Sequence, residues 1–305
     1  MNRNVTTERI AALITLLGDP DPAVHEPVRQ RLLAMGRAAL PALQAARAAS
    51  WCVATLARID GVIGCIHSLE VDRDLEAFAA LPEAEVDLER GCALLASIAY
   101  PDHTAAALGV CLDRLAVGLT ARLARCTTLA ERVETLCTHL FQDHRLQGGA
   151  VAGDDPDDGF LHRVVERRKG LPIALAAIAV LVGKRVGLAI DGVGMPCHFI
   201  AKAVEGDAQI LFDPWGGGTF LSRDQCAGLL GSWGVPFQEA YLETTSPRTI
   251  LARMCRNLIR PYWQREDHQR LGHVVRFLHG LEENGAVESS CRCAAHRLAH
   301  HDLAS

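Results

Sequence analysis

Two residues of this 305-residue chain stand at a spacing that suggests chemistry. His198 begins a short run, residues 198–204, and Asp213 directly follows the next run, residues 209–212. If both runs are antiparallel strands joined by a short hairpin, the two side chains lie close together. An imidazole beside a carboxylate supplies the base and the orienting group of a nucleophilic triad. A structural His–Asp hydrogen bond explains the pair at least as well.

The third member of such a triad would be a thiol, and the chain has eleven cysteines. Their number is odd, and the first ten residues lack the apolar stretch of a secretory signal. We therefore expect reduced thiols and a cytoplasmic protein. Cys197 adjoins His198, but neighbours in a strand point to opposite faces, so the two would not pair. Cys226 lies beyond the predicted strands, and no motif connects it to them.

Composition narrows the class of protein. The formal net charge is −5, so a general nucleic-acid-binding surface is not expected. No apolar run is long enough to cross a bilayer, so no membrane partner is expected either. Hydrophobic residues make up 49% but aromatic residues only 5%, which leaves mostly alanine, leucine and valine. Alanine and leucine favour helices, and we predict an α+β fold that is mainly helical.

The elements that would position His198 and Asp213 follow from periodicity. Helical spacing marks most of residues 8–147, with a break at residues 18–22. Residues 173–186 form a nearly all-apolar helix, which must be buried. Residues 190–193, 198–204 and 209–212 predict a small antiparallel sheet that ends at residues 213–218. From residue 248 to residue 281 the pattern is helical again.

Three other motifs suggest ligands less strongly. The acidic residues 154–159 do not match a calcium loop, because its third position is Pro156 and its twelfth is Val165, so we expect a solvated loop. The glycines at 216–218 lack the lysine and hydroxyl residue of a phosphate loop. The C-terminal residues have metal-binding side chains but not the usual zinc-knuckle spacing: Cys291, Cys293, His296 and His300. We expect no metal and no cofactor.

In combination, the motifs around His198 and Asp213 carry a family resemblance. The chain resembles the transglutaminase-like superfamily, and within it the bacterial SirB-type subgroup, over about residues 85–281. The matching motifs are Arg167-Arg168-Lys169-Gly170-Leu171-Pro172-Ile173, Pro196-Cys197-His198-Phe199 and Asp213-Pro214-Trp215-Gly216-Gly217. The superfamily core has a nucleophilic cysteine at the start of a buried helix, followed by a histidine and then an aspartate. The resemblance therefore implies a transglutaminase-like core and gives His198 and Asp213 the last two roles.

The flanks resemble protein-binding repeats, whose stacked helices present extended surfaces. Residues 1–60 resemble one HEAT repeat, and residues 246–305 resemble the subgroup's TPR-like helices, although the pattern stops after Leu281. We predict four segments: a HEAT-like segment 1–60, a helical region 61–147, the transglutaminase-like core 148–245 and the TPR-like segment 246–305.

Departures from the superfamily pattern decide the predicted function. The nucleophile's position, two residues after Gly170, is Pro172, as the subgroup resemblance leads one to expect. Proline has no nucleophilic atom, so His198 and Asp213 remain as a remnant pair. Cys197 stands where the subgroup usually has glycine, and Asp158-Gly159 stands in place of Asn-Ser. We predict a non-catalytic protein that binds a protein or peptide. The alternative is a hydrolase or acyl-transfer enzyme that uses His198 and Asp213 with water or another thiol.

Overall fold

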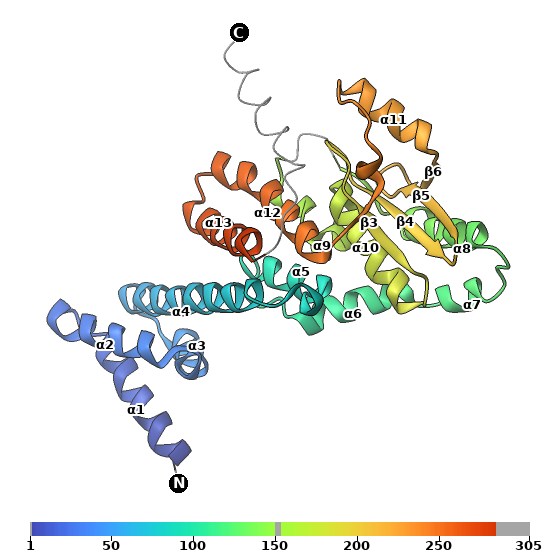
Figure 1. The fold of residues 1–305 in the computed structure, drawn as a ribbon. Coiled ribbons are helices and arrows are strands. Elements are labelled where there is room, and N and C mark those ends of the chain that lie inside the picture. The colour runs from blue at the N-terminus through green and yellow to red at the C-terminus, as the bar shows by residue number, and fades with distance from the viewer. Residues whose placement is uncertain (1, 150–153, 285–305) are drawn as a thin grey trace. The chain divides into compact units, whose positions relative to one another are not determined.

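The computed structural model describes residues 2–149 and 154–284, with side chains from Arg9 onward. It divides the chain into two compact units, residues 1–74 and 75–305 (Figure 1). Helices dominate, and one small antiparallel sheet lies in the second unit, which confirms the predicted α+β, mainly helical fold. The α-helices are α1 Asn2–Leu17, α2 Pro22–Met35, α3 Leu40–Ala49, α4 Val53–Ala79, α5 Leu88–Ser97, α6 Ala105–Ala116, α7 Leu119–Leu123, α8 Leu129–Cys137, α9 Leu161–Arg167, α10 Pro172–Arg185, α11 Arg223–Ser232, α12 Pro247–Gln264 and α13 His268–Glu283.

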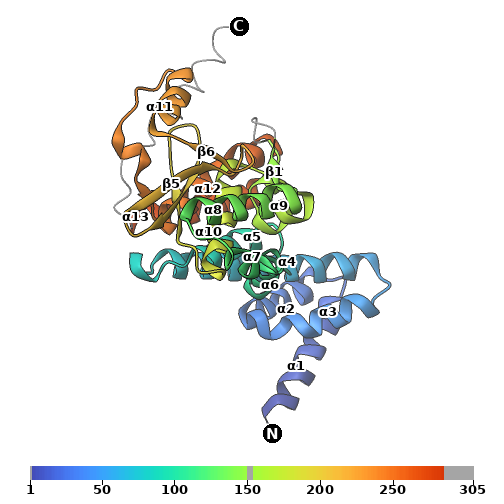
Figure 2. The same cartoon turned by 90° about the vertical axis from the view of Figure 1, so that its right-hand side faces the viewer.

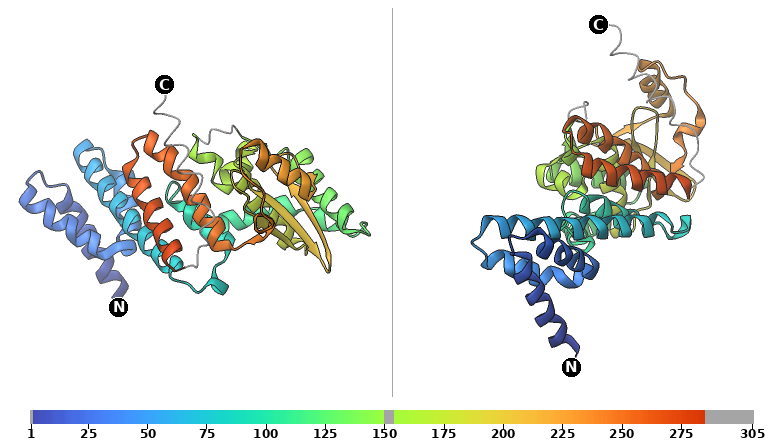
Figure 3. Two further views of the ribbon diagram at one scale, coloured as in Figure 1. Left: turned by 45° about the horizontal axis from the view of Figure 1, so that its top comes forward. Right: turned by 90° about the vertical axis from the view of Figure 1, so that its left-hand side faces the viewer.

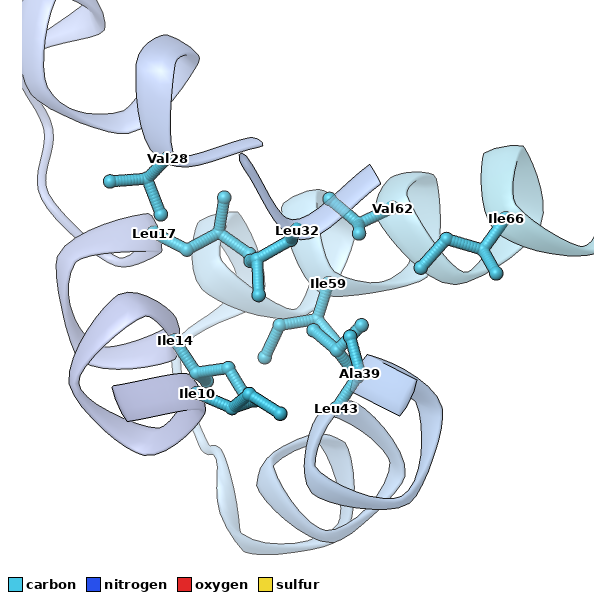
Figure 4. Close-up of a cluster of buried hydrophobic side chains, with 10 residues drawn as sticks. All are labelled: Ile10, Ile14, Leu17, Val28, Leu32, Ala39, Leu43, Ile59, Val62 and Ile66. Carbon is cyan, nitrogen blue, oxygen red and sulfur yellow. The ribbon is translucent and has the colours of Figure 1, made fainter. Parts of the chain in front are cut away.

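The first unit is an all-helical bundle of α1, α2, α3 and the part of α4 before Leu75. Asp21 caps α2 by accepting the N–H of Ala23 at 2.9 Å. Each helix contributes apolar side chains to one core, which Figure 4 shows converging: Ile10, Ile14, Leu17, Val28, Leu32, Ala39, Leu43, Ile59, Val62 and Ile66. The helices that the spacing at the start of the sequence predicted are therefore present, and they share this core.

The sheet of the second unit has five strands in the order β6-β5-β4-β3-β7, all antiparallel to their neighbours. Their bounds are β3 Ile190–Val193, β4 Ile200–Glu205, β5 Ala208–Asp213, β6 Thr219–Leu221 and β7 Thr244–Thr245. The three central strands are those predicted from the sequence. A separate parallel pair joins β1 Gln147–Gly148 to β2 Lys169–Gly170.

Two details of the predicted sheet are wrong. The sheet does not end at residues 213–218, because Gly217 and Gly218 adopt φ of +74° and +87° and turn the chain back into β6. His198 is not a strand residue, because β4 begins at Ile200. It ends a tight turn from Met195, in which the N–H of His198 donates to the Met195 carbonyl at 3.3 Å.

Helices support the sheet of this unit. The apolar helix α10 packs against β3 and β4, and α8 packs against β4 and β5 (Figure 2). Almost all of α10 is buried, as its sequence predicted. The C-terminal helices α12 and α13 run side by side (Figure 3), and α12 also contacts α5 and α10. The residues that follow the sheet are therefore part of the core of this unit.

Candidate functional site

The predicted His–Asp pair is in contact. His198 Nε2 lies 2.9 Å from Asp213 Oδ2, and both residues are buried. The β4–β5 hairpin brings them together, since Ala201 pairs with Phe212 and each side chain lies just beyond that pairing. The second carboxylate oxygen, Oδ1, accepts the backbone N–H of Trp215 at 2.9 Å. Both oxygens of Asp213 are thus engaged, which fixes the orientation of the imidazole.

The other ring nitrogen of His198 is open. Among the described residues, none makes a hydrogen bond to Nδ1, and Nδ1 is not one of the buried unpaired side-chain atoms. This nitrogen is thus not fully enclosed, although His198 as a whole is only 7% exposed. Because an ionised carboxylate only accepts hydrogen bonds, a neutral His198 ring beside it would carry its proton on Nε2 and present a lone pair at Nδ1. The geometry is that of an oriented base.

Two tryptophans flank the imidazole. The ring centroids of His198 and Trp215 are 6.1 Å apart in an edge-to-face arrangement, and those of His198 and Trp233 are 5.9 Å apart. Trp233 is 41% exposed, so it presents apolar surface to solvent close to the imidazole. Trp233 comes from the end of α11, thirty-five residues after His198, and no sequence motif indicated it.

Among the described residues, the start of α10 is connected to the pair only through Trp215, which lies beside His198 and packs on Gly148. A Cβ on Gly148 would lie 2.4 Å from Trp215 Nε1, so the indole packs directly on this glycine. Gly148 pairs with Gly170, and Pro172 follows as the first helical residue of α10. Proline suits this position, since the first N–H of a helix has no partner within the helix. Pro172, at the position that the resemblance assigns to the nucleophile, is thus the first residue of a helix and has no sulfur atom.

The two buried thiols of this region have raised pKa values. Cys226 is buried, and burial together with the negative charge of Asp213 raises its pKa. Cys137 packs against Gly218, and burial raises its pKa to about 12. Cys197 is exposed while His198 is buried, and it lies in the turn with φ of +63°. In the part of the chain the structure describes, no cysteine sulfur makes a hydrogen bond to His198.

The predicted solvated acidic loop is a structured turn instead. Residues Pro156–Asp158 form a 3-10 turn in which Asp155 accepts the N–H of Asp157. Asp158 is only 2% exposed, and its carboxylate lies 3.2 Å from Lys169 Nζ. Arg167 pairs with Asp155 at 2.7 Å. Cationic partners from α9 and β2 neutralise the loop, which is why its own composition was misleading.

The sequence reasoning missed a second cluster with histidines. His162 on α9 is 5% exposed and stacks on His103, with ring centroids 3.8 Å apart. Tyr100 meets His162 edge to face at 4.8 Å, and its hydroxyl donates to Asp157. His162 Nδ1 and His103 Nε2 are buried without a hydrogen-bond partner. Burial, then the nearby positive charges of His103 and Arg163, lowers the pKa of His162 to about 4.

Across residues 2–149 and 154–284, no group of three or more His, Cys, Asp or Glu side chains is arranged to hold a metal ion. Cys291, Cys293, His296 and His300 lie outside the described residues. No helix within the described ranges is both long enough and apolar enough to cross a bilayer.

Comparison with known proteins gives the class that this fold and site define. Residues 107–256 match the sequence model of the Transglutaminase-like superfamily, a range that contains Pro172, His198 and Asp213. The second unit therefore carries a transglutaminase-like domain.

The chain belongs to the UPF0162 family. It is 30% identical to a UPF0162 protein of Xylella fastidiosa strain 9a5c over 189 residues, which cover 60% of this chain and 67% of the relative. A UPF0162 protein of Pseudomonas aeruginosa is 31% identical over 154 residues, covering 48% of this chain and 54% of that protein. F-box only protein 21 of Mus musculus is 26% identical over 108 residues, which cover 33% of this chain and 17% of that protein. No solved structure matches the chain.

Proposed function

We propose that this protein is a non-catalytic transglutaminase-like protein that binds a protein or peptide partner. The observation that carries the proposal is Pro172 at the first position of α10, combined with the lack of a hydrogen bond between His198 and any cysteine sulfur of the described residues. A covalent acyl intermediate needs a nucleophile, and an oriented base alone does not supply one. The His198–Asp213 pair then serves as a fixed polar group for recognition.

The surroundings of His198 support peptide binding. Among the described residues, none makes a hydrogen bond to Nδ1 of the imidazole, and the rings of Trp215 and Trp233 both lie near it. Tryptophan combines a large apolar face with an N–H donor, which suits recognition of mixed polar and apolar chains. An extended peptide is the ligand that best uses such an alternation of surfaces.

The flanking helices extend the proposal. We also propose the four segments predicted from the sequence: HEAT-like residues 1–60, the helical region 61–147, the core 148–245 and TPR-like residues 246–305. Membership of the SirB-type subgroup is part of the same proposal. A concave surface in the first unit supports a binding role for that unit. Its volume is about 430 Å³, and it is lined by apolar residues such as Leu33 and Ile66 beside the Arg37–Glu70 ion pair. A reducing, cytoplasmic location agrees with nine free cysteines among the described residues.

Selection of peptides tests the proposal directly. A phage-displayed library of random twelve-residue peptides is panned on the full chain, and selected peptides are titrated by fluorescence anisotropy. We expect binding that Trp233→Ala weakens at least tenfold and that Trp263→Ala leaves unchanged. Trp263 is a matched control because it is 67% exposed on α12, away from the His198 ring contacts. Failure to select any peptide whose binding depends on Trp233 contradicts the proposal.

An enzyme remains the second candidate, because one observation favours it. Asp213 holds Nε2 while Nδ1 is open, which is the arrangement a general base needs to activate water. The test incubates the protein with dimethylcasein, with and without a dansylated amine, and measures ammonia release and amine incorporation. Activity that His198→Ala abolishes establishes the enzyme and removes the non-catalytic proposal.

A further inference from the structure

Arg253 connects the C-terminal helices to the turn that carries His198. Its Nη1 donates to the carbonyl oxygen of Met195 at 2.8 Å, and its Nη2 donates to that of His198 at 2.7 Å. These carbonyls belong to the first and last residues of the four-residue turn. A guanidinium is a rigid planar fork, so two such bonds fix the separation and direction of both carbonyls together.

The packing of Arg253 makes this clamp rigid. Its Cζ lies 5.3 Å from the ring centroid of Phe199, a residue that is 1% exposed. A Cβ on Gly194 would lie 3.5 Å from Nη1, so the backbone closes over the guanidinium from another side. A cation held against an aromatic face and bonded to two carbonyls has little freedom to move.

The turn itself needs such support. Cys197, its third residue, has φ of +63°, a conformation that residues other than glycine adopt at a cost of about 1 kcal/mol or more. A turn with proline in second position and left-handed φ in third position is of type II, which favours glycine there. With cysteine in place of glycine, the turn depends more on contacts from outside.

We infer that Arg253 is a positioning residue for His198. It acts through the Met195–His198 turn, so that α12 determines where the imidazole lies relative to Asp213. The C-terminal helices are then a structural part of the candidate site. The inference rests on the proposed function only in giving His198 a role, since the positioning itself is measurable without any ligand.

The test reads the His198 ring by long-range proton–nitrogen NMR on the full chain, with the resonances assigned by their loss in His198→Asn. In the wild type we expect the Nε2–H tautomer. In Arg253→Gln we expect shifted ring resonances and a loss of at least a third of that tautomer. Arg253→Lys keeps the charge but has no fork, and we expect a change between the two.

Arg256→Gln is the matched control, because Arg256 lies one turn along α12 and pairs with Glu282 of α13 at 2.5 Å. Its His198 resonances should equal those of the wild type. Unchanged resonances in Arg253→Gln, or equal changes in Arg256→Gln, overturn the inference. If Arg253→Gln does not fold, Arg253→Lys is measured in its place, and unchanged His198 resonances in that variant overturn the inference. Peptide selection can fail without affecting this result, so the failure of the proposed function and the failure of this inference are distinguishable.

Discussion

Two of the buried histidines in the second unit, His198 and His162, have sharply different surroundings. His198 and His162 are almost equally inaccessible, at 7% and 5% exposed. His198 has a carboxylate 2.9 Å from Nε2 and an open Nδ1. His162 has another imidazole stacked on it at 3.8 Å and a buried Nδ1 without a partner.

The difference shows that burial alone does not define a site for chemistry. A buried imidazole that is not hydrogen-bonded to a carboxylate favours its neutral form and packs as an aromatic ring. An imidazole oriented by a carboxylate and open on its other nitrogen keeps the geometry of a base. Four measurements test this contrast.

The largest expected effect is on the pH dependence of stability. The pKa of His162 is lowered to about 4 in the folded protein, whereas the unfolded residue titrates near 6.5. The neutral ring therefore contributes stability that is present above pH 6.5 and lost as the pH falls toward 4. We expect the free energy of unfolding to fall by on the order of 2 kcal/mol from this group between pH 7 and 4.5.

Urea unfolding at both pH values measures this effect. His162→Phe keeps the aromatic stack but has no titrating nitrogen, so its loss of stability between pH 7 and 4.5 should be smaller by that amount. Equal losses in the two proteins contradict the assignment of a neutral, packing role to His162.

The second effect concerns the carboxylate that distinguishes His198. Asp213→Asn removes a charged acceptor of two hydrogen bonds, one from His198 Nε2–H and one from the Trp215 N–H. We expect a loss of about 2 kcal/mol in the free energy of unfolding, since bonds to charged groups contribute about 1.5–3 kcal/mol. Asp207→Asn, at an exposed position in the β4–β5 hairpin, should cost almost nothing. Similar losses in both variants would show that Asp213 does not hold the imidazole.

The third effect tests whether residue 172 lies next to Nδ1 of His198. In Pro172→Cys, a thiol placed near Nδ1 should form a thiolate more readily. We expect iodoacetamide to alkylate it at pH 7 about ten times faster than in Pro172→Cys with His198→Ala, a difference of about 1.4 kcal/mol. Mass spectrometry of the peptide containing residue 172 separates this thiol from the native ones. Equal rates mean that the start of α10 does not face the imidazole.

The smallest effect comes from the turn before His198. Cys197→Gly relieves a left-handed conformation, and we expect the free energy of unfolding to rise by about 0.5–1 kcal/mol. Cys197→Ala keeps the Cβ atom and should give no such gain. A thermal unfolding series of the two variants and the wild type provides the comparison. Stabilisation by alanine equal to that by glycine would show that the thiol, and not the backbone, is responsible.

Much of the fold was predictable because helical periodicity and the apolar run of α10 report burial directly. The contact of His198 with Asp213 was predictable too, since one hairpin joins them. Strands β6 and β7 were not, because each has three residues or fewer and exists only through pairing with β5 or β3. Strands this short do not show the alternation of apolar and polar residues that marks a strand in a sequence.

The parts of the site that were missed come from distant segments. Trp233 and Arg253 follow His198 by 35 and 55 residues, and no sequence pattern between them indicates that either residue lies against the His198 region. Asp158 was misjudged for the same reason, because Arg167 at the end of α9 and Lys169 beyond it neutralise its charge. Motifs within a hairpin are visible in a sequence, whereas contacts between elements are not.

Pro172 removes more from the start of α10 than a sulfur atom. The first backbone N–H groups of a helix point outward unpaired and are natural donors to a developing negative charge on a carbonyl oxygen. Proline has no N–H, so the first of these donors is missing at this helix. A single residue type thus deprives the site of both an attacking atom and an oxyanion donor. Pro172→Ala would return only the donor, which separates the two losses experimentally.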